Sequence, residues 1–544
     1  MMPAKVANIL VVLILIVLSL AILANSMAKP LGRDEQMYCT GGALLAEGRA
    51  IYKDFSYAAQ LPYHPLLCAA LFKIFNTTHY LLVGRILSSF CDIFVLVCIV
   101  GIYRYIFNSF AITGMLLGLA AAILYVFNPV VDYANGYAWN HDVVTLCVVL
   151  SFWLFVSTDF NHKSKCRRIA AIGALLTFAS CMRITTALVE LLFFVMLLSR
   201  PAESMKQRLK TAPPFLAAAA FVSIWPVWVI AQAPRAFFMN LVKIPMLYGQ
   251  WLHEIGMVYN KFELTLACLA QPGYFALVVL AIYLCLLMVC LRRSRRVGFS
   301  PPRQSSRRVG FSPPRQSWWG KPHPTILAAL LPLTFFIIAL IPPTMWRQYL
   351  AMPVPFLIIS FAFPLLYVRK LSNKTGISKH FKIAAALVTV CVLAAVACYP
   401  AVLYRTPIVL VPERWVPIEI HKISEDIAKK LKTQNHVSSA AEGSKLILTL
   451  APLLALEGGS DIYTELSCGA IIYRIADSMS PSERSVTNTV GPKTLIELLE
   501  KSPPSAVILG VEMRRLEEPI FESTVKPDWE RKVYENGIVV YFRP

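Results

Sequence analysis

Charged residues are scarce in this chain of 544 residues, and acidic residues are the scarcest. Asp, Glu, Lys and Arg make up only 15% of the sequence, and 31 Asp and Glu stand against 52 Lys and Arg. A soluble protein that binds nucleic acid carries its positive charge on a polar surface. Here 57% of the residues are hydrophobic, more than one core can hide. The composition excludes most soluble classes and predicts a polytopic membrane protein with no nucleic-acid partner.

The cysteines lack the paired spacings of a disulfide framework or a zinc site. Most of the 13 lie in apolar stretches, where a free thiol behaves as a small hydrophobic group. The first apolar stretch lacks a convincing Ala-x-Ala cleavage site, so we expect a retained helix and not a cleaved signal peptide. Residues 405–544 contain no glycine-rich phosphate loop, so no nucleotide site is expected there.

Long apolar stretches dominate the rest of the chain. A helix needs roughly 20 apolar residues to cross about 30 Å of hydrocarbon. Five long stretches contain no Asp, Glu, Lys or Arg: 6–28, 211–234, 264–291, 322–346 and 383–404. Shorter apolar stretches lie at about 86–103, 111–130, 143–158, 169–182, 184–199 and 348–368. We therefore expect about eleven transmembrane helices, including two short ones that meet near Arg183.

The positive charge predicts the orientation, because Lys and Arg of short loops stay on the cytoplasmic side. Four loops hold 22 basic residues against two acidic ones, a net charge of +20: 159–168, 200–210, 292–323 and 369–382. With eleven spans and a cytoplasmic N-terminus, all four lie inside the cell. The segments that then lie outside are 28–79, 131–141, 234–263 and everything after Arg405. We expect a bacterial inner-membrane protein whose C-terminal part is periplasmic.

The sequence divides at about residue 405. Residues 1–404 are predicted to form an α-helical membrane domain, whereas 405–544 carry a net charge of −2 and alternate helix-like and strand-like patterns, typical of a soluble α/β domain. We expect helices at 420–431 and 494–501 in this domain. We expect strands at 445–450 and 505–510, and an edge strand at 537–542. The loop 292–323 contains the tandem repeat SRRVGFSPPRQS, at 294–305 and 306–317. It is typical of a tolerated insertion; the alternative is an arm that binds anionic lipid.

Polar residues are concentrated in the first external loop, 28–79, and not at mid-span as in a transporter. Asp34 and Glu35 follow the first span by a few residues, which places two carboxylates at the lipid–water interface. Two interpretations of this pair are open. The carboxylates either act in general-base chemistry, or they stabilise the first turn of a helix.

The order of short motifs resembles the GT-C integral-membrane glycosyltransferases, in particular the family 39 protein O-mannosyltransferases and the aminoarabinose transferase of lipid A. The resemblance covers essentially the whole chain, and the order and common external placement of the motifs carry it. The matching residues are Asp34, Glu35, Tyr38, Gly48, Tyr52 and Asp54 in the first loop, Gly84-Arg85, Asn128-Pro129, Asn140-His141-Asp142, and Trp346-Arg347-Gln348-Tyr349 followed by Pro353 and Pro355.

This resemblance implies a GT-C-like fold and inverting transfer of a sugar from a polyprenyl-phosphate donor to an acceptor hydroxyl. It makes Asp34 the base, Glu35 its partner or a metal or acceptor contact, and Asp142 a further catalytic carboxylate. A phosphate leaving group needs fixed positive charge nearby. The implied donor-phosphate contacts are Arg347, Tyr349, Arg183, Arg85, His64 and Tyr38. Relatives in the aminoarabinose branch carry Glu-Lys-Pro where this chain has Tyr63-His64-Pro65, which leaves the use of a divalent metal ion open.

Each of these residues also has a structural interpretation: His64 as a packed loop residue, Arg183 as a helix-end arginine, Asp142 as a helix cap, and Arg347-Gln348-Tyr349 as an interfacial anchor. Glu190, within a short span, is expected to be structural or coupled to Asp92. Two rival functions are a transporter of a lipid-linked intermediate and a non-catalytic envelope assembly protein. The enzyme's expected partners are the lipid-linked donor, a lipid, glycan or protein acceptor, and membrane lipids.

Overall fold

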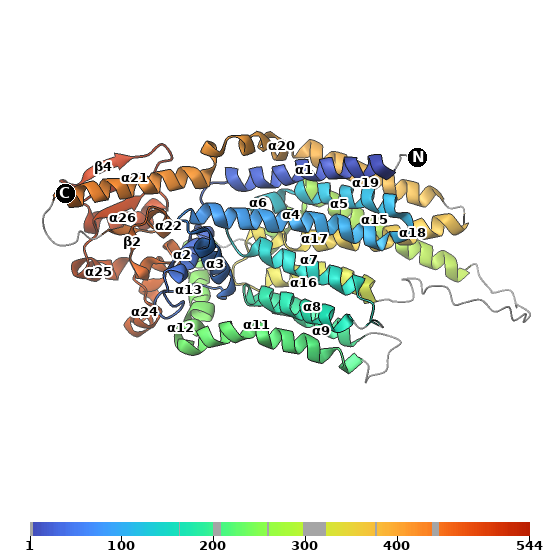
Figure 1. Ribbon diagram of the computed structural model, residues 1–544, viewed down its shortest axis with the longest axis horizontal. Coiled ribbons are helices and arrows are strands. Elements are labelled where there is room, and N and C mark those ends of the chain that lie inside the picture. The colour runs from blue at the N-terminus through green and yellow to red at the C-terminus, as the bar shows by residue number, and fades with distance from the viewer. Residues whose placement is uncertain are drawn as a thin grey trace, which may run out of the picture.

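A bundle of long helices forms one end of the molecule, and the C-terminal domain, from α21 (Val416–Val437) onward, forms the other (Figure 1). This computed structural model describes residues 4–160, 162, 164–199, 208–257, 260–297, 323–375, 378–437 and 445–544. Nearly all of the tandem repeat lies outside the described residues. We call the end of the bundle next to the C-terminal domain the domain end. The start of α1 (Ala4–Ala28), the end of α18 (Ala362–Thr375) and the start of α19 (Ser378–Cys398) lie at the opposite end (Figure 1).

The predicted apolar stretches form the bundle. Seven segments among the described residues are long and apolar enough to cross a membrane: Lys5–Ala28, Tyr80–Ile106, Asn108–Val126, Ala212–Gln232, Pro272–Leu291, Arg347–Ser372 and Lys379–Cys398. Their helices are α1 (Ala4–Ala28), α4 (Tyr80–Ile106), α5 (Ala111–Val126), α11 (Ala212–Gln232), α15 (Pro272–Val297), α17 (Pro353–Ser360), α18 (Ala362–Thr375) and α19 (Ser378–Cys398). The chain is therefore a multi-pass membrane protein.

The other four predicted spans also form helices, but shorter ones: α7 (His141–Ser157), α8 (Lys165–Ser180), α9 (Ala187–Leu198) and α16 (His323–Leu340). The 12 residues of α9 extend only about 18 Å as a helix, less than the thickness of the hydrocarbon. The total of about eleven spans therefore stays a prediction. As the sequence predicts, 169–199 forms two helices, and the chain breaks at Arg183.

Short helices connect the spans. The remaining elements before the C-terminal domain are α2 (Arg33–Ala46), α3 (Tyr63–Phe75), η1 (Asn108–Phe110), α6 (Pro129–Ala134), η2 (Ile184–Thr186), α12 (Pro234–Phe238), η3 (Met239–Lys243), α13 (Ile244–Glu254), α14 (Lys261–Leu269), η5 (Arg347–Leu350), α20 (Ala401–Tyr404), η6 (Thr406–Leu410) and η7 (Pro412–Arg414). Of these, α2, α3, α12 and α13 lie between the bundle and the C-terminal domain (Figure 1). Helices α2 and α3 approach so closely that a Cβ on Gly42 would lie 2.7 Å from the Cβ of Cys68.

The C-terminal domain is a five-stranded mixed sheet with helices, in the order β2-β1-β3-β5-β4. Strand β1 pairs in parallel with β2 and β3, and β5 pairs antiparallel with β3 and β4. Residue Leu448 of β1 lies opposite Val507 of β3, and Ile508 lies opposite Val540 of β5. The strands are β1 (Leu446–Thr449), β2 (Asp461–Ile462), β3 (Ala506–Leu509), β4 (Glu530–Val533) and β5 (Val539–Phe542).

The helices of this domain are α21 (Val416–Val437), α22 (Pro452–Glu457), η8 (Thr464–Leu466), α23 (Ala470–Tyr473), η9 (Ala476–Ser478), α24 (Pro481–Thr487), η10 (Pro492–Thr494), α25 (Leu495–Lys501) and α26 (Arg514–Thr524). The three predicted strands and two predicted helices are all present. The placement of 537–542 at an edge was wrong, because β5 lies between β3 and β4. The edge strand on this side is β4, whose sequence Glu-Arg-Lys-Val is mostly exposed and charged, as is common at sheet edges.

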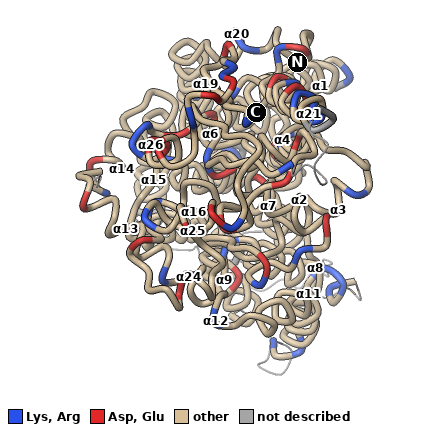
Figure 2. The backbone as a smooth tube through the Cα atoms, turned by 90° about the vertical axis from the view of Figure 1, so that its left-hand side faces the viewer, with Lys and Arg blue, Asp and Glu red and all other residues tan. Residues whose placement is uncertain are grey.

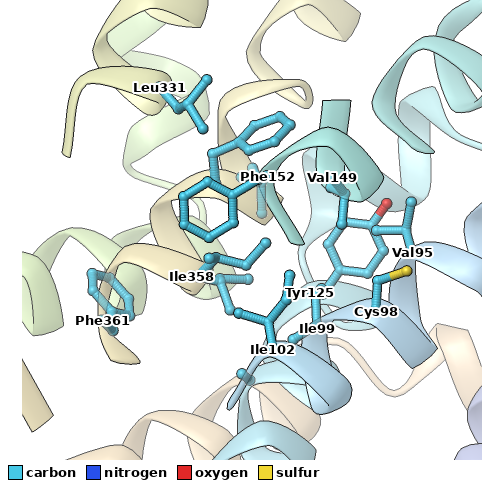
Figure 3. Close-up of a cluster of buried hydrophobic side chains, with 14 of the residues drawn as sticks. Val95, Cys98, Ile99, Ile102, Tyr125, Val149, Phe152, Leu331, Ile358 and Phe361 are labelled. Carbon is cyan, nitrogen blue, oxygen red and sulfur yellow. The ribbon is translucent and has the colours of Figure 1, made fainter. Parts of the chain in front are cut away.

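Two kinds of hydrophobic core hold the molecule together. Within the bundle, side chains of α4, α5, α7, α16 and α17 interdigitate, and Figure 3 shows Ile99, Tyr125, Phe152 and Ile358 among them. At the domain end, buried residues of α2, α3 and α4 share one core with α21, α22 and the sheet. Leu454 of α22 belongs to this shared core. The C-terminal domain is therefore packed directly on the bundle and is not merely tethered to it.

Seen from the C-terminal domain, the backbone positions of basic and acidic residues are interspersed (Figure 2). This agrees with the small net charge of residues 405–544. The basic residues Arg369 and Lys370 lie near the end of α18, at the other end of the bundle.

Candidate active site at the domain end

The acidic pair of the first loop lies in the first turn of α2. Gly32 is the N-cap of this helix, and Oε1 of Glu35 accepts a hydrogen bond of 2.7 Å from the Gly32 N–H. This contact satisfies an N–H that the helix itself cannot pair, and the helix dipole favours acidic residues here. Because successive residues of a helix project about 100° apart, Asp34 faces a different side from Glu35.

Glu35 forms an ion pair with Arg85 of α4, and neither side chain is exposed to solvent. The Arg85 Nη2 lies 2.6 Å from Oε1, and Nε donates to Oε2 at 3.0 Å. The other N–H groups of Arg85 donate to carbonyl oxygens at the end of α1, those of Ser26, Lys29 and Pro30, at 2.9, 2.7 and 2.9 Å. All five N–H groups of the guanidinium are thus used inside the protein.

The Glu35 carboxylate also binds the backbone of the second external segment, 131–141. The backbone N–H of Ala138 donates to Oε2 of Glu35 at 3.0 Å. A Cβ on Gly84 would lie 2.6 Å from the Cβ of Ala138, so the glycine of the Gly84-Arg85 motif permits this approach. Glu35 therefore accepts four N–H groups, and Arg85 has none left for a phosphate. The geometry gives both residues a structural role instead of the metal, acceptor or phosphate contacts that the sequence suggested.

Asp34 is in the opposite situation. Its side chain is half-buried, and among the described residues its carboxylate accepts no hydrogen bond and forms no ion pair. Burial raises the pKa of Asp34, and the positive charges of Arg33, Arg474 and Arg183 oppose that rise. A partly desolvated carboxylate with open lone pairs, close to guanidinium groups, has the properties of a general base.

Arg183 and Tyr349 lie near Asp34. The Arg183 guanidinium is 4.8 Å from the centre of the Tyr349 ring, and its Nη1 is 3.2 Å from Sδ of Met352. Within the described ranges no carboxylate forms an ion pair with Arg183. Its charge acts on both Asp34 and Tyr38. We call Asp34, Tyr38, Arg183 and Tyr349 the Asp34 site. Its members come from α2, the turn before η2, and η5.

Tyr38 lies one turn after Asp34 and is buried. Its ring contacts those of His64 and Tyr57 edge-on, with centroid distances of 4.9 and 5.9 Å. Burial and the negative charge of Asp34 raise the pKa of Tyr38. The hydroxyl therefore stays protonated at neutral pH and is available as a neutral hydrogen-bond donor.

His64 supports this aromatic packing. It is 1% exposed, and its Nδ1 lies 3.8 Å from Sγ of Cys68. Burial lowers the pKa of His64 to about 3. The imidazole is neutral at pH 7 and contributes no positive charge for a phosphate. The geometry favours the interpretation as a packed residue over the predicted phosphate contact.

Asp142 belongs to a second polar cluster. Its Oδ2 accepts a hydrogen bond of 2.9 Å from the Gly136 N–H, and its Oδ1 is buried without a hydrogen-bond partner in the part of the chain that the structure describes. No hydrogen bond or ion pair between described residues joins it to Asp34. The second cluster consists of Asn25, Lys29, Asp92, Tyr125, Asp132, Asn135, Asp142, Tyr399 and Arg405.

Arg347 lies near the second cluster and not in the Asp34 site. Its Nη2 donates to Oε1 of Gln271 at 2.9 Å, and its guanidinium lies 4.7 Å from the centre of the Tyr133 ring. Its charge acts on Tyr399. The short helix η5 thus directs Tyr349 to the Asp34 site and Arg347 away from it. The predicted phosphate contacts are therefore not all together: Tyr38, Arg183 and Tyr349 lie in the Asp34 site, whereas Arg347 lies near the second cluster.

Two further predictions have structural answers. Glu190 accepts hydrogen bonds from the hydroxyls of Thr177 and Ser180 at 2.5 and 2.8 Å, which joins α8 to α9. Its partners are therefore these hydroxyls and not Asp92, which accepts from Tyr125 and Asn135. The described ranges hold no group of three or more His, Cys, Asp or Glu side chains arranged to bind a metal ion.

Sequence reasoning missed the contribution of the C-terminal domain. Arg474, directly after α23, and Glu512, which precedes α26, lie close to Arg33, which precedes Asp34. Tyr248 and Trp251 of α13 lie against Arg474. No motif links these positions, which are hundreds of residues apart from Asp34 along the chain. The one available signal was the cluster of aromatic residues in 234–263.

No family model and no curated protein matches the sequence. Among solved structures, ArnT from Cupriavidus metallidurans bound to undecaprenyl phosphate matches 99% of this chain and 98% of its own, with a TM-score of 0.58 and 12% identity. The apo state of ArnT matches the same shares with a TM-score of 0.57 and 12% identity. The oligosaccharyltransferase of Archaeoglobus fulgidus matches 98% of this chain and 74% of its own, with a TM-score of 0.47 and 10% identity. The chain therefore has the same fold as ArnT along nearly its whole length.

Proposed function

We propose that this protein is an inverting glycosyltransferase that moves a sugar from a polyprenyl-phosphate donor to an acceptor hydroxyl. The observation that carries the proposal is the Asp34 site. A half-buried carboxylate without a partner lies beside Arg183, which has no carboxylate partner among the described residues. The ArnT-like fold supports the proposal, since ArnT itself binds undecaprenyl phosphate.

In the proposed reaction, Asp34 takes the proton of the acceptor hydroxyl while the oxygen attacks the anomeric carbon of the donor. The bond between that carbon and the phosphate oxygen breaks, and its electron pair remains on the departing polyprenyl phosphate. Attack from the face opposite the leaving group inverts the anomeric configuration. No strong acid is needed, because the phosphate is a good anionic leaving group. Arg183 supplies positive charge, and the hydroxyls of Tyr38 and Tyr349 supply neutral donors.

We also propose that the site faces the periplasm of a bacterial cell. The five basic residues of 369–382 lie in the last part of α18 and the first part of α19, which are at the end opposite the C-terminal domain (Figure 1). Positive charge in short loops favours the cytoplasm, so the domain end would lie outside. A polyprenyl tail can then stay in hydrocarbon while its phosphate and sugar reach Asp34 at the end of the bundle.

Mass spectrometry of envelope lipids and glycans, with and without the gene, tests this function and identifies the sugar and acceptor. In the deletion strain, wild-type protein should restore the missing product. Asp34→Asn should reduce the rate of product formation by about 10²–10⁴-fold, the usual contribution of a general base. The matched control is Asp461→Asn, an exposed acid of β2, which should restore wild-type levels.

Immunoblots of membranes must show equal amounts of the variants. Full product formation by Asp34→Asn at equal abundance would refute the assignment of the base. An unchanged envelope in the deletion strain, combined with movement of labelled polyprenyl-phosphate lipid across vesicles containing the protein, would favour a transporter.

A further inference from the structure

Arg474 is a buried arginine that the C-terminal domain directs toward the bundle. It is only 7% exposed, and its Nε donates to the Ala470 carbonyl oxygen at 2.5 Å. Its guanidinium lies 5.0 Å from the centre of the Trp251 ring and 5.6 Å from that of Tyr248, both on α13. Its Nη2 is buried without a hydrogen-bond partner among the described residues. The side chain is thus held between the C-terminal domain and α13.

Arg474 shares a carboxylate with Arg33 of α2. Oε2 of Glu512 lies 2.9 Å from Nε of Arg33 and 3.7 Å from Nη2 of Arg474. The Glu512 side chain is 2% exposed, whereas that of Arg33 is 43% exposed. Two guanidinium groups therefore face one carboxylate, and one positive charge of this trio remains uncompensated by Glu512.

The trio adjoins the Asp34 site. Arg33 is the neighbour of Asp34 in α2, and the charges of both Arg33 and Arg474 act on the Asp34 carboxylate. We propose that Arg474 is a positioning residue of the Asp34 site: together with Arg33 and Glu512 it sets the charge around the base, so that the C-terminal domain completes the site. The inference rests on the proposed function of Asp34 as a base.

The charged groups around Asp34 come from several elements. Arg33 and Glu35 lie on α2, Arg474 directly after α23 and Arg183 before η2. Tyr38, Tyr248 and Tyr349 also interact with Asp34 electrostatically. A nearby cation favours the ionised form of a carboxylate, and a nearby anion disfavours it. Removing Arg474 should therefore raise the pH at which Asp34 ionises, and removing the charge of Glu512 should lower it. If the trio were purely structural, loss of Arg474 and loss of the Glu512 charge would not shift the ionisation of Asp34 in opposite directions.

Difference infrared spectroscopy of the purified full-length protein tests this directly and needs no substrate. Subtracting the Asp34→Asn spectrum isolates the carboxyl band of protonated Asp34, which is then followed against pH. Arg474→Gln should move the titration midpoint of Asp34 up by about half to one pH unit, and Glu512→Gln should move it down. Arg474→Lys retains the charge and should stay within about 0.3 unit of the wild type. Arg33→Gln, at the more exposed position, should move the midpoint in the same direction as Arg474→Gln, which keeps the test valid if the latter variant does not fold.

Equal midpoints in all variants, or shifts of one sign in Arg474→Gln and Glu512→Gln, would overturn the inference. The pH dependence of product formation in isolated membranes gives a second measurement. If Asp34 is the base, the acidic limb of that profile should move with the infrared midpoint. Infrared shifts of opposite sign with an active Asp34→Asn variant would retain the electrostatic role of Arg474 but refute the function of Asp34. An inactive Asp34→Asn variant without such shifts would refute only the role of Arg474.

Discussion

Replacement of Arg85 by Met separates two explanations of the Gly84-Arg85 motif. If Arg85 held the donor phosphate, the variant would fold normally and require more donor. In the structure, Arg85 is instead part of a buried ion pair that joins α1, α2 and α4. We therefore expect Arg85→Met to reduce the free energy of unfolding, whether or not a donor is present.

The magnitude follows from the contacts that are lost. Without the guanidinium, the buried Glu35 carboxylate keeps only the N–H groups of Gly32 and Ala138, and three carbonyl oxygens of the α1 end lose their donors. Removing one member of a buried pair costs about 3–5 kcal/mol, because an uncompensated charge remains. Replacing both members with Met removes that charge, so Glu35→Met/Arg85→Met should lose less than the sum of the single variants, by about 2–3 kcal/mol.

Equilibrium unfolding in mixed detergent micelles, followed by far-ultraviolet circular dichroism, measures these differences. Arg104→Met is the matched control, since Arg104 is an exposed residue near the end of the same helix, and it should change the free energy by less than about 0.5 kcal/mol. An Arg85→Met variant as stable as Arg104→Met, with a raised KM for the lipid-linked donor, would refute the structural role of Arg85 and restore the phosphate assignment.

Two other predictions concern residues of the first loop and the short spans. The pKa of His64 is about 3 in the folded protein and about 6.5 in an unfolded chain. Below pH 6.5 the unfolded state therefore binds a proton that the folded state excludes. The free energy of unfolding consequently falls as the pH drops from 6.5 toward 3. Between pH 6.5 and 5 the wild type should lose about 1.6 kcal/mol more than His64→Gln in the same unfolding assay, and equal losses would show that His64 does not titrate in this way. Glu190→Gln retains an acceptor for one of the two hydroxyls and a donor for the other, so its free energy of unfolding should stay within about 1 kcal/mol of the wild type. A loss of several kcal/mol would indicate that the charge of Glu190 is required.

Local patterns sufficed for the elements of the fold but not for the partners of the site residues. Apolar stretches and strand-like runs such as 445–450 were correctly located, because hydrophobic periodicity is a property of neighbouring residues. Asp34 and Glu35 are adjacent and chemically alike. Yet Asp34 has no hydrogen-bond partner in the described part of the chain, whereas Glu35 accepts four N–H groups. That difference depends on Arg85 and Ala138, whose approach no local pattern encodes. For the same reason, the position of Arg474 required the complete fold.

Helices α2 and α3 are made before the C-terminal domain with which they share a core. Their buried faces are covered by α21, α22 and the sheet, and the N–H of Leu81 donates to Glu457, 376 residues later. At about 5–20 residues per second, synthesis of that interval takes roughly 20–75 s. During biogenesis the apolar faces of α2 and α3 therefore lack their native contacts over this interval, and lipid or a chaperone would have to cover them. Truncation before β4 and β5 should therefore leave the apolar faces of α2 and α3 partly uncovered even when the rest of the chain is complete.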